Sequence, residues 1–180
     1  MRSQGSGLQA TNALIERGHR NIAFITGSMD SPTAIERLSG YKEALTAVGL
    51  PINDALIISG KWSAASGAAA VEALLAAGQT FSAILASNDE MAIGAMKKLN
   101  DAGIAVPTDV SVIGFDNIPT APFLIPALSS VKDPVSDMVS EVISQIISML
   151  DGGYLSEQNK FVSELILRES VTSGPYLKPR

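Results

Sequence analysis

The chain has 180 residues, of which 46% are hydrophobic and 17% charged, and this composition excludes an intrinsically disordered protein. Its formal net charge of −5 argues against nucleic-acid binding by these residues, because phosphate recognition depends on clustered Lys and Arg. With no cysteine and one histidine, the sequence offers no disulfide, no thiolate and no histidine metal site, and we expect no cofactor.

Short apolar runs alternate with helix-period stretches up to about residue 120. A first helix is predicted over 5–17, with Gly18 as its C-terminal cap. Buried strands are predicted at 21–26, 55–59, 83–86 and 110–115. The helices between them are predicted at 34–48, 64–77 and about 90–102. Strands that alternate with helices predict an α/β fold with a parallel, doubly wound sheet and right-handed crossovers.

The pattern changes after Pro119, where several prolines mark loops. A long helix with a broad apolar stripe follows over about 135–150, then a late strand over 161–167 and a frayed tail over 174–180. The preceding units already cover both faces of the sheet. The 135–150 helix therefore either closes this sheet or belongs with a partner domain.

No apolar run approaches the roughly 20 residues that a membrane helix needs, and the first 19 residues lack the apolar segment of a signal peptide. We therefore predict a cytoplasmic protein that contacts no membrane.

Each predicted strand is followed by polar or aromatic residues. In chain order these are Ser28, Asp30, Arg37, Lys61, Trp62, Asn88, Asp89, Asp116 and Asn117. Because the carboxyl ends of parallel strands meet at one edge, we expect these side chains on the same rim. Carboxylates, amides and a guanidinium can bridge hydroxyl groups, and an indole can cover an apolar ring face. The set therefore suits a sugar.

Each of these residues also has a structural interpretation. Asn88 or Asp89 would cap the next helix, Asp116 would form a turn, Trp62 would pack in a core or interface, and Arg37 would be a solvated charge on a helix. Only their convergence on one edge favours a binding site.

Enzyme motifs are absent. The sequence contains no GxxxxGK[ST] phosphate loop, no GxGxxG after the first strand, no GxSxG elbow and no HExxH. A carboxylate pair such as Asp89 and Asp116 could in principle do acid–base chemistry, but no nucleophile or metal set supports it. We therefore predict that the protein is not an enzyme.

Four stretches resemble a known family in their order and spacing. They are ERGHRNIAFITGS (16–28), SPTAIERLSGYKEAL (31–45), SNDEMAIGAMKKLNDAGIAVPTDVSVIGFDN (87–117) and PALSSVK (126–132). Over residues 5–173 the chain resembles the second half of the effector-binding core of the LacI/GalR family of bacterial transcription repressors.

The resemblance implies a three-layer α/β fold with a parallel sheet, of the type called periplasmic-binding-protein-like I. This chain would be mostly the C-terminal subdomain of that fold. It assigns 1–18 to the end of the first subdomain and a crossover helix, 19–131 to the effector-binding subdomain, 132–160 to a crossover helix of the first subdomain, and 161–180 to a returning strand and tail. The DNA-binding domain of the family is absent, so operator DNA would be bound only through such an N-terminal domain.

The resemblance also implies particular ligand contacts. Arg37 in ERLSGY, Asn88 in SNDEMA and Asp116 in GFDN match the effector contacts of the family, and Trp62 in GKWSA matches a position that lines the cleft. Asp133 follows SSVK, at the position of a hinge-proximal contact where the family more often has Gln or an apolar residue, and we include it among the predicted effector-binding residues.

We therefore predict the sugar-effector-binding portion of a LacI/GalR-type repressor of carbohydrate genes, with β-glucoside genes as one candidate. The expected partners are a sugar or glycoside effector and a second copy of the chain in a homodimer. Alternatives are an exported sugar-binding protein of the same fold, a small α/β enzyme and an assembly module. The sequence does not specify the sugar.

Overall fold

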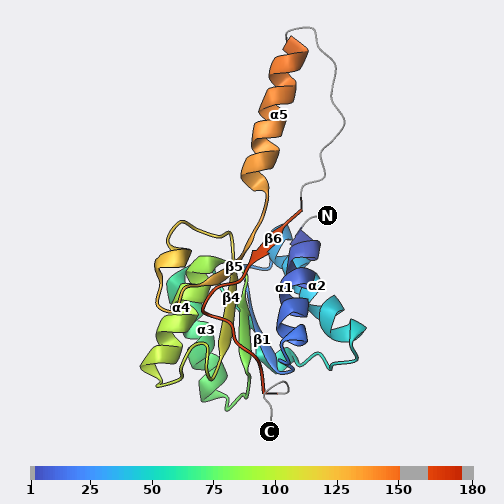
Figure 1. Cartoon of the computed structure of the whole chain (residues 1–180). Helices are drawn as coiled ribbons and strands as arrows, with labels where there is room; N and C mark the ends of the chain where they lie inside the picture. The colour runs from blue at the N-terminus through green and yellow to red at the C-terminus, as the bar shows by residue number, and fades with distance from the viewer. Residues whose placement is uncertain (1–2, 151–161, 176–180) are drawn as a thin grey trace.

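The computed structural model describes residues 3–150 and 162–175 as a six-stranded sheet with helices on both faces (Figure 1). The strand order is β2-β1-β3-β4-β5-β6, with β1 to β5 parallel and β6 antiparallel to β5. The strands are β1 Ile22–Thr26, β2 Ile57–Ser59, β3 Ala83–Ala86, β4 Ser111–Phe115, β5 Ser129–Lys132 and β6 Glu164–Ile166. The predicted α/β class with a mostly parallel sheet is confirmed.

The helices follow the predicted spacing within a few residues. They are α1 Ser3–Glu16, α2 Pro32–Ala47, α3 Ala64–Ala76, α4 Asp89–Asp101 and α5 Val135–Leu150, with short 3-10 turns at Asp54–Leu56 and Ala121–Phe123. The segment 151–161 and the predicted tail beyond residue 175 lie outside the described residues.

One strand was not predicted. The segment that forms β5 lies between Pro126 and Pro134, in the region after Pro119 where prolines predict loops. Both serines are nevertheless fully buried. The hydroxyl oxygen of Ser129 accepts the backbone N–H of Arg168 at 2.8 Å, and the hydroxyl of Ser130 donates to Asp89 at 2.7 Å. A buried hydroxyl is tolerated once it has a hydrogen-bond partner, and these partners come from distant segments.

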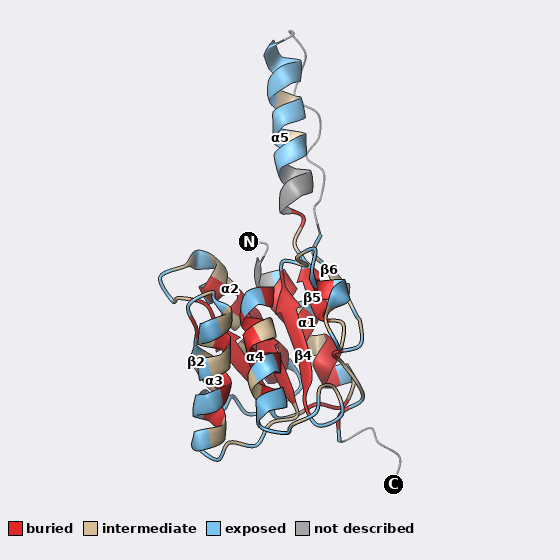
Figure 2. Ribbon diagram, turned by 90° about the vertical axis from the view of Figure 1, so that its left-hand side faces the viewer, coloured by how far each residue is buried: buried red, intermediate tan, exposed pale blue. Residues whose placement is uncertain are grey.

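Two hydrophobic clusters fill the space between the sheet and its helix layers. Ile25 and Ile84 point toward α3 and α4, whereas Phe24 and Leu85 point toward α1 and α2. This alternation follows from the period of two along each strand. Figure 2 shows the resulting buried sheet behind helices whose outer surfaces are exposed. The layers hold the carboxyl ends of β1 to β5 at a common edge.

Helices α3 and α4 pack with their backbones in contact. A Cβ atom added at Gly67 would lie 2.0 Å from the carbonyl oxygen of Met91, and one added at Gly94 would lie 1.8 Å from that of Ala64. Because neither neighbour is a flexible side chain, the two glycines are required for this approach. This close packing of α3 against α4 fixes the position of the start of α4, which follows Asn88, at the edge of the sheet.

Helix α5 does not close the sheet, so the first of the two alternatives for this helix is wrong. It leaves the carboxyl edge after β5 and projects away from the domain (Figures 1 and 2). Its apolar stripe is exposed at Val139, Val142, Ile143, Ile146, Ile147, Met149 and Leu150. Within residues 3–150 and 162–175, no helix combines the length and apolarity needed to cross a bilayer.

We predict that Gly94→Ala lowers the free energy of unfolding by about 2–3 kcal/mol, because the new methyl group would push α4 away from α3. Gly5→Ala is the matched control, since nothing lies within 4 Å of a Cβ at this position in α1. It should be neutral or stabilising by up to about 1 kcal/mol. Urea denaturation followed by circular dichroism measures both, and a Gly94→Ala variant as stable as wild type would contradict the packing described.

Candidate functional site

Arg37 lies at the centre of a charged cluster on the carboxyl edge of the sheet. It extends from α2 and is only 3% exposed. Its Nη1 donates to the carbonyl oxygen of Ser87 after β3, and its Nη2 donates to Asp116 Oδ1 at 3.3 Å and Asp133 Oδ2 at 2.7 Å. Arg37 therefore joins the exits of β3, β4 and β5.

The ring of Phe115, the last residue of β4, packs against the guanidinium of Arg37. The Cζ atom of Arg37 lies 4.4 Å from the centroid of the Phe115 ring, a cation–π geometry. We call Arg37, Phe115, Asp116 and Asp133 the Arg37 cluster. Phe115 was not among the predicted site residues, because a buried strand aromatic carries no signal in the sequence that separates it from the core.

Asn88 and Trp62 form a second group beside the cluster. The amide oxygen of Asn88 accepts the backbone N–H of Met91 at 2.9 Å, so Asn88, not Asp89, caps α4. Its Nδ2 donates to the carbonyl oxygen of Trp62 at 3.0 Å. Ser87, whose carbonyl Arg37 binds, immediately precedes Asn88 and connects the two groups.

The Trp62 side chain lies over the exit of β1. A Cβ added at Gly27 would lie 2.0 Å from Trp62 Cζ2, so the glycine leaves the space that the indole occupies. Trp62 is half-buried and has a positive φ of 61°, in the left-handed region that residues other than glycine rarely adopt. It also packs against the hydrophobic cluster of α3 and α4, so its packing role and its place at the rim coexist.

Asp116 begins a strained turn after β4. Asp116 and Asn117 have φ values of 95° and 48°, in the left-handed region that residues other than glycine rarely adopt. The Asp116 side chain is 46% exposed, so its carboxylate can accept hydrogen bonds from a ligand as well as from Arg37. Partial burial raises the pKa of Asp116, and the Arg37 guanidinium opposes this shift.

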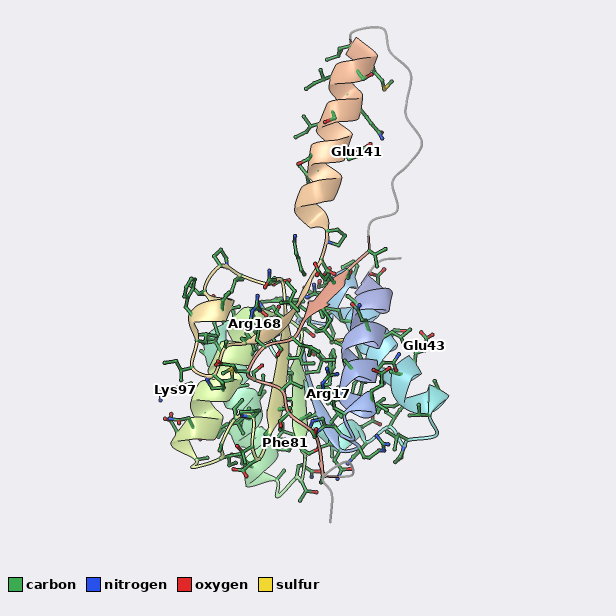
Figure 3. All side chains as sticks on the ribbon, in the orientation of Figure 1. Arg17, Glu43, Phe81, Lys97, Glu141 and Arg168 are labelled. Atoms are coloured by element: carbon green, nitrogen blue, oxygen red, sulfur yellow. The ribbon has the colours of Figure 1, made fainter. Side chains whose placement is uncertain are left out.

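Asn117 and Asp89 turn away from the rim. Asn117 Oδ1 accepts a hydrogen bond at 2.7 Å from Arg168, which is labelled in Figure 3 on the segment after β6. Asp89 is fully buried and accepts hydrogen bonds from Ile118 and Ser130. Burial raises the pKa of Asp89 to about 6. Both residues therefore serve the structure of the turn.

Asp133 joins the cluster to the segment that leaves the sheet after β5 and to the segment that enters β6. Its Oδ1 accepts the hydroxyl of Ser163 at 2.6 Å, just before β6, while its Oδ2 binds Arg37. The base of α5 and the start of β6 are thereby held together. The structure brings Arg37, Asp116 and Asp133 into direct contact, with Asn88 and Trp62 adjacent.

The site carries one buried cation and two carboxylates, without a nucleophile activated by a base. The described ranges contain no cluster of three His, Cys, Asp or Glu residues that could hold a metal ion. Buried Arg37 Nε and Ser87 Oγ have no hydrogen-bond partner among the same residues. Such a set can accept and donate hydrogen bonds to hydroxyl groups, and an effector role for the five predicted residues stays a prediction.

The sequence profile described as "Periplasmic binding protein-like domain" matches residues 11–171. The HTH-type transcriptional regulator AscG of Escherichia coli (strain K12) is 57% identical over 162 residues, which are 90% of this chain and 48% of AscG. The chain spans about half the length of the curated relatives it matches, or less.

Solved structures extend this likeness to the fold. A sugar-binding transcriptional regulator of the LacI family from Escherichia coli, complexed with phosphate, superposes with a TM-score of 0.92 at 54% identity, over 96% of this chain and 62% of that one. The complex of the transcriptional regulator CelR with cellobiose superposes with a TM-score of 0.83 at 35% identity, over 94% of this chain and 52% of that one.

The raised pKa of Asp89 predicts a pH-dependent stability. Between about pH 4 and pH 6 the folded protein keeps a proton on Asp89 that the unfolded chain has lost, so this group makes the free energy of unfolding fall as pH rises. A shift from 3.8 to about 6 corresponds to about 3 kcal/mol. Asp89→Asn removes the titration, so wild type should lose about 2–3 kcal/mol relative to this variant between about pH 4 and pH 7. Urea denaturation of both proteins across that pH range measures the difference in the free energy of unfolding. If this difference does not change with pH, the prediction is refuted.

Proposed function

Because this chain belongs to the periplasmic binding protein-like domain family, in the form found in the effector-binding cores of LacI-family regulators, we propose that it binds a sugar or glycoside at the carboxyl edge of its sheet. The observation that carries the proposal is the convergence of Arg37, Asp116 and Asp133 beside Asn88 and Trp62. A relative that was solved with cellobiose supports the class of ligand.

Each residue has a defined role in this proposal. The exposed carboxylate of Asp116 accepts a ligand hydroxyl, and Arg37 donates once the ligand competes with its intramolecular partners. Asn88 keeps a second amide hydrogen for a ligand oxygen, and the Trp62 indole covers an apolar sugar face. Asp133 accepts a further hydroxyl at the base of α5.

We further propose that the protein serves as the effector-binding part of a repressor of carbohydrate genes and has no catalytic activity. Effector binding would act on DNA only through a change in the populations of two protein conformations. The net charge of −5 supports assigning operator contact to a segment outside these 180 residues. A cytoplasmic location belongs to the same proposal.

We propose that residues 19–131 form the effector-binding unit and that 132–160 belongs with the first subdomain of the family. The exposed stripe of α5 is then a docking surface for a second folded domain. It leaves the same edge as the Arg37 cluster, so a domain packed on α5 would stand over the bound sugar.

We also propose that two copies associate through an apolar groove between α4 and the loop after β4. The groove has a volume of about 450 Å³ and is lined mainly by apolar side chains, including Ile93, Met96, Ile104 and Leu124. Ile125, which also lines the groove, is 97% exposed, and Phe123, beside Leu124 in the chain, is 82% exposed. A protruding apolar loop beside an apolar groove is self-complementary, as a two-fold interface requires.

Asp116→Asn and Arg37→Gln should each weaken the binding of cellobiose or methyl β-glucoside at least about tenfold, because each removes a charged hydrogen-bonding group. Isothermal titration calorimetry on wild type and variants measures this. Lys97→Gln is the control, since Lys97 lies on the outer surface of α4 and pairs with Asp101 (Figure 3). A wild-type protein that binds none of a panel of glycosides, or turnover of any of them, would count against the proposal.

Ile125→Glu should shift a homodimer toward monomers, because it places a charge in the centre of the apolar contact. Sedimentation equilibrium measures the change in association. Val48→Glu makes the same kind of change at an exposed apolar residue at the end of α2 and should leave association unchanged. Wild-type protein that sediments as a monomer would refute the interface.

A further inference from the structure

Asp89 is a carboxylate with no solvent exposure that the proposed ligand contacts do not use. It is the first residue of α4, beside the cap residue Asn88. Because an ionised group in the interior is unfavourable unless its oxygens accept hydrogen bonds, the partners of Asp89 show what it holds in place.

Both oxygens of Asp89 serve the turn after β4. Oδ2 accepts the backbone N–H of Ile118 at 2.9 Å, and Oδ1 accepts the hydroxyl hydrogen of Ser130 at 2.7 Å. The Ser130 oxygen then accepts the backbone N–H of Asn117 at 2.9 Å. Since a hydroxyl has one hydrogen, its donation to Asp89 leaves the Ser130 lone pairs for Asn117. The carboxylate thus sets the direction of the chain of hydrogen bonds.

The turn needs these partners, because Asp116 and Asn117 both adopt the left-handed conformation. Its successive N–H groups go to the carbonyl oxygen of Val131, to Ser130 and to Asp89. The same conformation aims the Asp116 carboxylate at Arg37, with 3.3 Å between Oδ1 and Nη2. Two of the three anchors of the turn therefore depend on Asp89.

The sheet leaves a space for this carboxylate. A Cβ atom added at Gly114 in β4 would lie 2.1 Å from Asp89 Oδ1. A side chain at this position would displace the Asp89 carboxylate from the turn. Gly114 is therefore a second, independent feature that fits the placement of Asp89.

We propose that Asp89 is a positioning residue for the sugar site, which holds the turn over residues 116–118 so that the Asp116 carboxylate faces the ligand beside Arg37. Asp89 acts through the turn and touches no ligand. Its effect on affinity rests on the proposed function, whereas its hold on the turn does not.

The test compares Asp89→Ala and Asp89→Asn with the wild-type chain. Cellobiose affinity is measured by calorimetry, and amide hydrogen exchange at Asn117 and Ile118 is measured by NMR. Asp89→Ala should lower the affinity about tenfold and speed exchange at both amides about tenfold or more. Asp89→Asn keeps an oxygen for Ile118 and offers an N–H to Ser130, so both quantities should stay within about threefold of wild type.

Asp109→Ala is the matched control. Asp109 Oδ2 accepts the backbone N–H of Ala105 at 2.8 Å, in the loop that enters β4 at the opposite edge of the sheet. The control removes the same kind of contact and should change neither the affinity nor the two amides. A purely structural role for Asp89 would instead lower the melting temperature without a selective effect at Asn117 and Ile118.

Folded Asp89→Ala with wild-type affinity and wild-type exchange would overturn the proposal. If this variant does not fold, Ser130→Ala takes its place, since it removes both the acceptor of the Asn117 N–H and the link from that acceptor to Asp89. Unchanged exchange at Asn117 and unchanged affinity in Ser130→Ala would equally overturn the proposal. If wild type binds neither cellobiose nor any other glycoside, the proposed function fails. Exchange at the two amides then decides whether Asp89 holds the turn, with unchanged rates refuting it.

Discussion

The arrangement of the carboxyl edge depends on the need to pair one buried cation. Arg37 is held in the interior on the ring of Phe115, where an unpaired guanidinium would be strongly unfavourable. Its pairing requires Asp116 from the exit of β4 and Asp133 from the exit of β5. This one side chain therefore links helix α2 to the ends of β4 and β5. The same group that organises the edge is the one most suited to bind a polar ligand there.

The two carboxylates that follow β3 and β4 have opposite surroundings. Asp89 is enclosed and ties α4 to the following turn, whereas Asp116 remains nearly half exposed beside Arg37. The interior carboxylate has a pKa of about 6, because burial disfavours its charge more than its hydrogen bonds favour it. Asp89 thus supports the strained turn, and the turn places the carboxylate of Asp116 at the surface beside Arg37.

The apolar surface of the domain falls into two separate places. The stripe on α5 stands beyond the carboxyl edge, while Ile125 lines the groove beside α4 and the exposed Phe123 lies in the same loop. Surfaces of this kind in a small domain are typical of contacts with other folded units. The stripe on α5 is the proposed surface for a second folded domain, and the groove beside α4 is the proposed surface for a second copy of the chain.

The sequence by itself determined the order and type of most elements and the edge at which Arg37, Asn88 and Asp116 gather. Burial patterns repeat within each segment, so strands such as 83–86 and the helix after Asn88 could be recognised locally. Only the tertiary structure decided that the two serines of β5 are buried, that Asp89 turns inward while Asp116 turns outward, and that α5 leaves the sheet. These outcomes depend on partners far away in the chain, such as Arg168 for Ser129 and Ser130 for Asp89. Hydrogen bonds between distant segments leave no periodic trace in the sequence, and for that reason the polar interior could not be read from it.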